Sequence, residues 1–230
     1  MSDKTWNCIK KDIKTKKFEL GCYFSYQLMN TPRHLLFTMA RYKFAAKMLP
    51  QDEKIKVLEL GCQEGLGSLL LAEAGHNVLG IDFDKKAIKY AQKNIRKHNI
   101  AFKYADFIDK RFGTFQAVIS IDVIEHICSY KEDRFIKTIY SNLMSSGFCL
   151  IGTPNITASQ YASKYSKIGH VNLFTAERLD ALLRKYFNNV FIFGMNDEVV
   201  HTGFQPMCHY IMALACGKKS DTRVKKYGEK

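Results

Sequence analysis

Three glycines and two carboxylates in the chain have the types and spacing of a nucleotide-binding turn. Glu59 stands two residues before Gly61, and the segment then opens a helical pattern through Gly65 and Gly67. Such a turn between a strand and a helix lets a ligand approach the backbone closely. Asp82 ends the next apolar run, where an acid either accepts hydrogen bonds from ribose hydroxyls or caps the following helix. The spacing therefore favours a ligand that contains a ribose.

The same turn does not fit a dinucleotide. That fingerprint requires G-x-G-x-x-G, but the third position counted from Gly61 is Gln63, and the sixth counted from Gly65 is Leu70. The carboxylate of Glu59, ahead of the first glycine, suits a ligand that presents an amine. We therefore interpret the turn as a site for a ligand with an amine and a ribose rather than a diphosphate.

The elements that must position these residues alternate along the chain. Short apolar runs predict strands at 56–60, 77–82, 101–104, 115–122 and 148–152. Amphipathic stretches predict helices at 66–74, 85–98 and 131–144. Strand and helix in regular succession imply right-handed crossovers and a parallel sheet with helices on both faces. The predicted fold class is therefore α/β with a doubly wound sheet.

The two ends of the chain extend this arrangement. A helix is predicted at 175–187 with Thr175 as its N-cap, and further strands at 190–193 and 208–216 make a mostly parallel, seven-stranded sheet. An apolar stripe at 34–48 predicts a helix near the N-terminus. We expect three parts, which are an N-terminal helical cap at 1–54, a cofactor-binding domain at 55–217 and a basic tail at 218–230.

The net charge of +13 is concentrated at the two ends. Residues 1–54 have a net charge of +6 and residues 217–230 one of +4, so only +3 remains between them. A basic face on the body of a protein indicates nucleic-acid binding, whereas basic ends are typical of solvated segments. The distribution argues against a nucleic-acid partner and weakly favours an anionic small molecule.

Composition excludes several classes of protein. No apolar run approaches the roughly 18 to 20 residues of a membrane span, and residues 1–17 are charged where a secretory signal has an apolar core. The seven cysteines are odd in number and never spaced C-x-x-C, which argues against a disulfide scaffold or a zinc ribbon. We expect a cytoplasmic protein with reduced thiols. The sequence does not indicate its oligomeric state.

Four segments resemble, in order, the class I S-adenosylmethionine-dependent methyltransferase family. They are residues 57–65, 80–82, 105–107 and 115–127. The resemblance spans roughly 55–215 and implies a Rossmann-like methyltransferase domain with S-adenosylmethionine as its cofactor. One departure is Gln63, where the family usually has glycine, and this side chain narrows the space above the turn.

The resemblance also implies roles for individual residues. The first segment would wrap the methionine part of the cofactor, and Asp82 would bind the ribose. Asp106 would contact the adenine amine, with Phe107 packed on the ring, although Asp106 could also be an ordinary turn residue. The implied cofactor-binding residues are Glu59, Gly61, Cys62, Gly65, Gly67, Asp82, Phe83, Asp106, Phe107 and Asp122.

The transfer chemistry points to the loop after the fourth predicted strand. Methyl transfer from a sulfonium is an in-line displacement, and it needs a base only where the acceptor must lose a proton, as a hydroxyl does. Asp122, Glu125 and His126 follow that strand at the ligand edge of the sheet. We predict that His126 is the base and that Glu125 orients it. Alternatively, His126 is a loop histidine packed on the cofactor, or Glu125 belongs to a divalent metal site. We expect no metal.

A second histidine, His170, is predicted beside the acceptor. Residues 169–175 resemble G-H-V-x-x-F-T segments in methyltransferases of sugars and surface-polysaccharide precursors, whereas residues 123–126 resemble ubiquinone-biosynthesis O-methyltransferases. We therefore expect O-methylation of a sugar, phosphate-bearing or surface-polysaccharide precursor. The alternatives are an RNA methyltransferase and a non-catalytic cofactor-binding protein.

Overall fold

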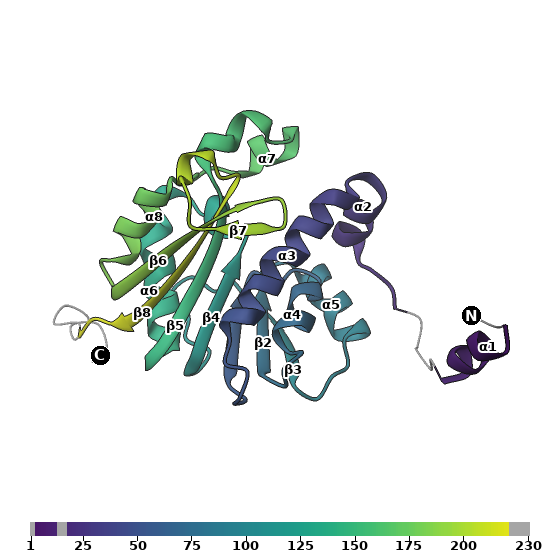
Figure 1. The fold of residues 1–230 in the computed structure, drawn as a ribbon. Coiled ribbons are helices and arrows are strands. Elements are labelled where there is room, and N and C mark those ends of the chain that lie inside the picture. Colours follow the sequence, from purple (N-terminus) through teal and green to yellow (C-terminus); the bar gives the residue numbers. More distant parts are fainter. Residues whose placement is uncertain (1–2, 13–17, 221–230) are drawn as a thin grey trace.

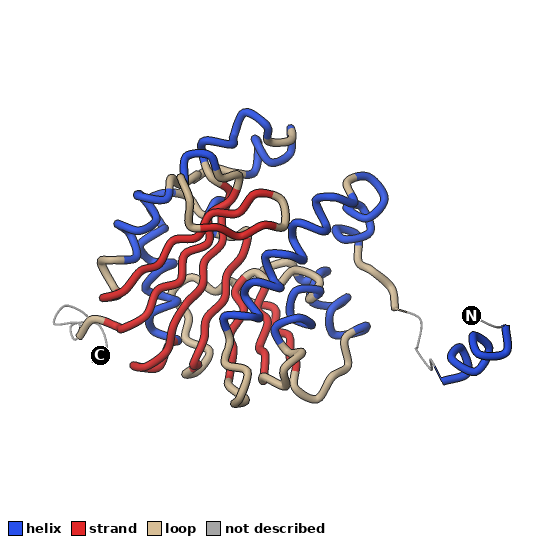
Figure 2. Tube along the Cα trace, in the orientation of Figure 1, coloured by secondary structure: helices blue, strands red, loops and turns tan. Residues whose placement is uncertain are grey.

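A single eight-stranded sheet lies at the centre of the computed structural model, which describes residues 3–12 and 18–220 (Figures 1 and 2). The strands are β1 Lys56–Leu60, β2 Asn77–Asp82, β3 Ile100–Tyr104, β4 Phe115–Ile121, β5 Leu143–Pro154, β6 Phe187–Asn196, β7 Val199–His201 and β8 Tyr210–Lys218. Their order across the sheet is β3-β2-β1-β4-β5-β8-β6-β7.

Strands β1 to β5 pair in parallel, whereas β8, β6 and β7 join antiparallel to their neighbours. The predicted α/β class and mostly parallel, doubly wound sheet are confirmed. The strand count differs, because β7 is an eighth strand where the sequence predicted seven. A three-residue edge strand is too short to show the alternation of apolar and polar residues by which strands are recognised.

Helices lie on both faces of the sheet. The α-helices of the described chain are α1 Asp3–Asp12, α2 Cys22–Asn30, α3 Pro32–Met48, α4 Leu66–Leu71, α5 Lys85–Asn94, α6 Glu132–Asn142, α7 Lys164–Gly169 and α8 Ala176–Leu183. Helices α3, α4 and α5 lie on one face, and α6 and α8 lie on the other (Figure 1). The Thr175 hydroxyl accepts a hydrogen bond from the Arg178 amide at 3.2 Å, which confirms the predicted N-cap of α8.

The N-terminal segment is helical, and α3 packs into the main body. Tyr42, Ala45 and Leu49 of this segment are buried in the same apolar cluster as residues of β1, β2 and β4. Most of the predicted tail, 221–230, lies outside the described residues. In the described part of the chain, no helix combines the length and hydropathy that a membrane crossing requires.

Candidate active site

The glycine turn after β1 adopts a left-handed backbone. Gly61 has a φ of +82° and Gly65 one of +81°, and the Gly61 amide donates a hydrogen bond to the Ile81 carbonyl at 2.8 Å. A Cβ atom at Gly61 would overlap the side chain of Val123, so only glycine allows this approach. The contact brings the predicted cofactor turn against the predicted transfer loop.

Asp82 faces this turn rather than the next helix. The amide of Gln63 donates to Asp82 Oδ2 at 2.8 Å, and the amide of Asp84 donates to Oδ1 at 2.8 Å. Asp84 caps α5, because its own carboxylate accepts from the Lys86 and Ala87 amides. The backbone φ of Gln63 is +50°, a conformation that glycine adopts most easily.

Glu59 is buried behind the turn. Its Oε2 accepts a hydrogen bond from the Ser68 hydroxyl of α4, and the Tyr42 phenol of α3 interacts with the same carboxylate. Burial raises the pKa of Glu59 to about 7. Oε1 accepts no hydrogen bond of normal geometry from any described residue. A ligand amine is the kind of group that would satisfy this buried oxygen.

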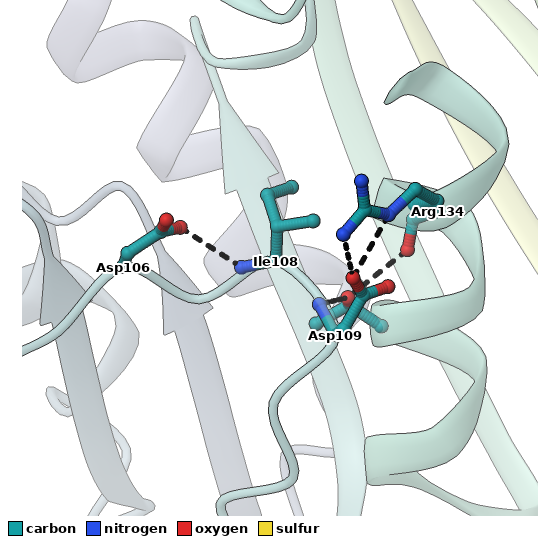
Figure 3. Close-up of polar contacts among 5 residues, drawn as sticks. Asp106, Ile108, Asp109 and Arg134 are labelled. Carbon is teal, nitrogen blue, oxygen red and sulfur yellow. Dashed lines mark hydrogen bonds and ion pairs between the residues drawn. The ribbon is translucent and has the colours of Figure 1, made fainter. Parts of the chain in front are cut away.

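Asp106 and Phe83 lie at the ligand edge near Asp82. The Ala105 amide donates to the Asp82 carbonyl at 3.0 Å, which places the loop after β3 beside β2. In this loop Asp106 Oδ1 accepts from the Ile108 amide at 3.1 Å (Figure 3). The Phe83 side chain is 71% exposed, so its ring is free to cover a ligand.

The loop that holds Asp106 is tied to α6. Asp109 Oδ2 accepts a hydrogen bond from Arg134 Nε at 2.8 Å (Figure 3). The Asp109 amide donates to the Thr138 hydroxyl at 2.7 Å. Two residues of one helix therefore fix the loop, which limits how far Asp106 can move.

Three of the predicted cofactor residues, Cys62, Phe107 and Gly67, lie against buried side chains. Cys62 is buried in the apolar cluster around α5. Phe107 is buried in the main core, where its ring centroid lies 6.0 Å from that of Phe135. A Cβ atom at Gly67 would overlap the Tyr42 ring of α3. These three residues shape the turn and its surroundings from behind.

Asp122 is held by the N-terminal helices. It follows β4 with a φ of +57°, and its carboxylate oxygens lie 3.0 and 2.8 Å from Nη1 of Arg41 in α3. The Arg41 guanidinium also lies over the Tyr210 ring, 3.8 Å from its centroid. Sequence reasoning selected Asp122 but neither Arg41 nor Tyr210.

Glu125 is completely buried beside this ion pair. Its Oε2 accepts a hydrogen bond from the Thr153 hydroxyl at 3.1 Å, and Oε1 has no partner among the described residues. Burial and repulsion by Asp122 raise the pKa of Glu125 to about 8. Burial therefore favours the protonated form of this side chain.

His126 and His170 meet edge to face. Their ring centroids lie 5.0 Å apart with an interplanar angle of 75°. Nδ1 of His126 lies 2.9 Å from the Gly169 carbonyl oxygen, and a carbonyl can only accept. Nδ1 therefore carries the hydrogen, and Nε2 of the neutral ring is the basic atom. The carbonyl of Gly169 orients this ring, and the predicted role of Glu125 stays a prediction.

Glu125, His126 and His170 form a candidate cation site. One ligand atom each from Glu125, His126 and His170 lies within 4.8 Å of the others. Two imidazoles and a carboxylate are ligands that divalent transition metals accept. The prediction that no metal is needed stays a prediction.

Two further residues from the N-terminal helices face this cluster. Partial burial raises the pKa of Tyr23 to about 12 although the residue is 45% exposed, and Asp122 acts in the same direction. Burial lowers the pKa of His34, Arg41 lowers it further and Asp122 opposes the change. His34 is not among the predicted site residues, because its distance in sequence from β4 gives no sign of this proximity.

A family model matches the chain over most of its length. The family is described as a methyltransferase domain, and the match covers residues 33–189. The chain belongs to this family. Membership confirms the resemblance to class I methyltransferases and the fold that it implied.

Curated relatives of this methyltransferase-domain protein are distant. The ubiquinone biosynthesis O-methyltransferase of Rickettsia akari (strain Hartford) is 30% identical over 112 residues, which are 47% of this chain and 44% of the relative. A probable S-adenosylmethionine-dependent methyltransferase of Mycobacterium tuberculosis (strain ATCC 25618 / H37Rv) is 26% identical over 138 residues, 60% of this chain and 50% of the relative. The chain spans about half the length of these relatives.

Solved structures agree with the fold. A protein from Pyrococcus horikoshii OT3 matches with a TM-score of 0.66 and 19% identity, over 87% of this chain and 100% of that one. The N-methyltransferase NodS from Bradyrhizobium japonicum WM9, in complex with S-adenosyl-L-homocysteine, matches with a TM-score of 0.58 and 15% identity, over 95% and 100% of the two chains. At these identities the likeness concerns the fold.

Proposed function

We propose that this chain binds S-adenosylmethionine at the glycine turn and transfers the methyl group to a hydroxyl of a small molecule. The donor set fits that cofactor, because Glu59 offers for the amine an oxygen, Oε1, that accepts no hydrogen bond of normal geometry from the described residues, and Asp82 offers a fixed carboxylate for the ribose. Phe83 is exposed where the adenine would lie. The names of the curated relatives support the same chemistry.

The observation that supports hydroxyl methylation best is the hydrogen bond between His126 Nδ1 and the Gly169 carbonyl. This bond leaves Nε2 of His126 without a hydrogen, in a loop that contacts the glycine turn through Val123 and Gly61. A base so placed removes the proton that a hydroxyl must lose as it attacks. Burial and the neighbouring His126 lower the pKa of His170, so His170 stays neutral when His126 gains a proton.

The proposed step is a single displacement. S-adenosylmethionine would supply an electrophilic methyl carbon on a sulfonium, with the neutral thioether as the leaving group. The chain would hold the acceptor hydroxyl beside the glycine turn, and Nε2 of His126 would take the hydroxyl proton as the acceptor oxygen is methylated. Positioning of this kind can lower the barrier by up to ~7 to 11 kcal/mol.

The acceptor class that we propose is a sugar, a phosphate-bearing metabolite or a surface-polysaccharide precursor. The support is the likeness of residues 169–175 to loops of enzymes that act on such molecules. An anionic acceptor would need a cation other than Arg41, because that side chain is already paired with Asp122. A cytoplasmic location belongs to the same proposal.

A screen with methyl-labelled S-adenosylmethionine tests this function. Purified protein is incubated with sugar nucleotides, quinone precursors and phosphorylated metabolites, and, in a separate arm, with RNA. We expect label in a small molecule and none in RNA. Label in RNA alone would favour the alternative nucleic-acid enzyme. Binding of S-adenosyl-L-homocysteine with no labelled product in any arm would favour a non-catalytic protein.

A further inference from the structure

Glu64 links the glycine turn to the N-terminal helices. It stands between Gly61 and Gly65, yet its carboxylate reaches the first turn of α2. Oε1 accepts a hydrogen bond from the Tyr23 amide at 3.0 Å, and Oε2 accepts one from the Phe24 amide at 3.1 Å. Glu64 is only 7% exposed. A residue of the cofactor turn therefore caps a helix about 40 positions earlier in the chain.

This cap supplies what α2 does not have itself. The N-cap residue, Gly21, offers no side chain, and the first turn of α2 contains no acidic residue. The first amides of a helix need outside acceptors, and a negative charge at that end is favourable. Phe24 and Gln27 are the only buried residues of α2. The two hydrogen bonds to Glu64 therefore supply acceptors that α2 itself lacks.

The contact between Glu64 and α2 is also sterically close. A Cβ atom at Gly21 would overlap the Glu64 carboxylate. Any larger residue at position 21 would have to displace Glu64 or shift the start of α2. Position 21 therefore gives a second, independent way to disturb the contact.

Tyr23, which donates one of these bonds, has its side chain on the candidate acceptor side. Its phenol interacts electrostatically with Asp122 and Arg41. Its backbone is thus fixed by the cofactor turn while its side chain faces the polar groups after β4. The hydrogen bond to Glu64 therefore fixes the backbone that carries this phenol.

We propose that Glu64 is a positioning residue that holds α2, and with it Tyr23, against the acceptor side of the site. The identification of that side as the acceptor side rests on the proposed function, whereas the contact between Glu64 and α2 does not. When S-adenosyl-L-homocysteine fills the glycine turn, Glu64 is fixed more firmly and α2 becomes more protected. The wall of the acceptor site is then completed by the same loop that binds the cofactor.

Hydrogen–deuterium exchange of the full chain, with and without S-adenosyl-L-homocysteine, tests this proposal. In Glu64→Ala we expect the Tyr23 and Phe24 amides to exchange about tenfold faster than in the wild type, as for a helix that loses its cap. The homocysteine derivative should slow these amides in the wild type but not in the variant. Glu64→Gln keeps one acceptor oxygen and should rescue part of the protection.

Two further variants complete the experiment. Gly21→Ala should speed exchange at the same amides, because it displaces the carboxylate. Glu19→Gln is the matched control, because Glu19 lies just before α2. This change removes an exposed ion pair with Lys93 of α5 and should leave the exchange of α2 unchanged. Wild-type exchange of α2 in both Glu64→Ala and Gly21→Ala would overturn the proposal. Uniformly faster exchange across the sheet would also overturn it, because Glu64 would then be merely structural.

The design separates this inference from the proposed function. If S-adenosyl-L-homocysteine fails to slow exchange of residues 61–67 in the wild type, cofactor binding is refuted. The comparison of the unliganded variants still decides whether Glu64 holds α2.

Discussion

The Arg41 guanidinium lies within hydrogen-bond distance of both carboxylate oxygens of Asp122, a residue 81 positions later in the chain. This pair fixes the start of the loop after β4, where Asp122 has a left-handed backbone. Helix α3 therefore holds the loop from which Glu125 and His126 project.

Breaking this pair should destabilise the protein. Arg41→Met leaves the Asp122 carboxylate without its partner, in a side chain that is only 30% exposed. We expect the free energy of unfolding in urea to fall by about 2 kcal/mol or more, and Asp122→Asn added to this variant should restore part of the loss. Lys93→Met, which removes an exposed pair, should have a much smaller effect. Equal effects in the two single variants would contradict this assignment.

The stability of the protein should decrease as the pH rises above 5. The pKa of Glu125 rises from 4.5 to about 8 on burial and that of Glu59 to about 7. Because the folded chain binds these protons more tightly than the unfolded chain, their contribution is complete below about pH 4.5 and is lost as the pH approaches 8.

Urea unfolding at pH 5 and pH 9 measures this effect. Glu125→Gln should lose less stability over the interval than the wild type, by more than about 1 kcal/mol. Glu177→Gln is the control. Hydrogen bonds from its own amide and from Thr175 lower the pKa of Glu177, so its titration lies below the interval. The prediction fails if Glu125→Gln and the wild type have the same pH dependence.

Asp82 should determine cofactor affinity. In Asp82→Ala the ribose loses a carboxylate that the Gln63 and Asp84 amides hold in place. We expect calorimetry to show binding of S-adenosyl-L-homocysteine weakened by ~1 to 3 kcal/mol. Asp84→Ala removes the α5 cap and should affect stability more than affinity. Unchanged affinity in Asp82→Ala would remove this residue from the site.

His126 should be needed for turnover. With an acceptor found in the screen, His126→Ala should reduce kcat by roughly 10²-fold or more, the range for loss of a general base. Affinity for S-adenosyl-L-homocysteine should remain. His98→Ala, at an exposed position, is the matched control. An unaltered rate in His126→Ala would leave that histidine with a packing role.

Removal of divalent metal should leave activity intact if His126 acts as a base. Glu125, His126 and His170 are close enough together to bind a cation, so the experiment discriminates between two chemistries. Activity is measured after treatment with a chelator and again after Mn²⁺ or Zn²⁺ is added back. Loss of activity on chelation and recovery with metal would make both histidines ligands.

Local patterns predicted the scaffold well, because strand and helix periodicity is set by neighbouring residues. The glycine turn and Asp82 followed from spacing in the same way. Pairs such as Arg41 with Asp122 could not be predicted, since nothing local marks a partner so far away in the chain. The direction in which a side chain points could not be predicted from the sequence either. Cys62 lies in the predicted turn, yet its side chain is buried in the core.

The contact between Gly67 and Tyr42 has a practical consequence for engineering. Helix α3 lies so close to α4 that a methyl group at position 67 would overlap the tyrosine ring. Residues 1–54 therefore cannot be exchanged for the corresponding segment of a relative as an interchangeable part. A working chimera would have to transfer Glu64 and Gly67 together with the helices that they contact.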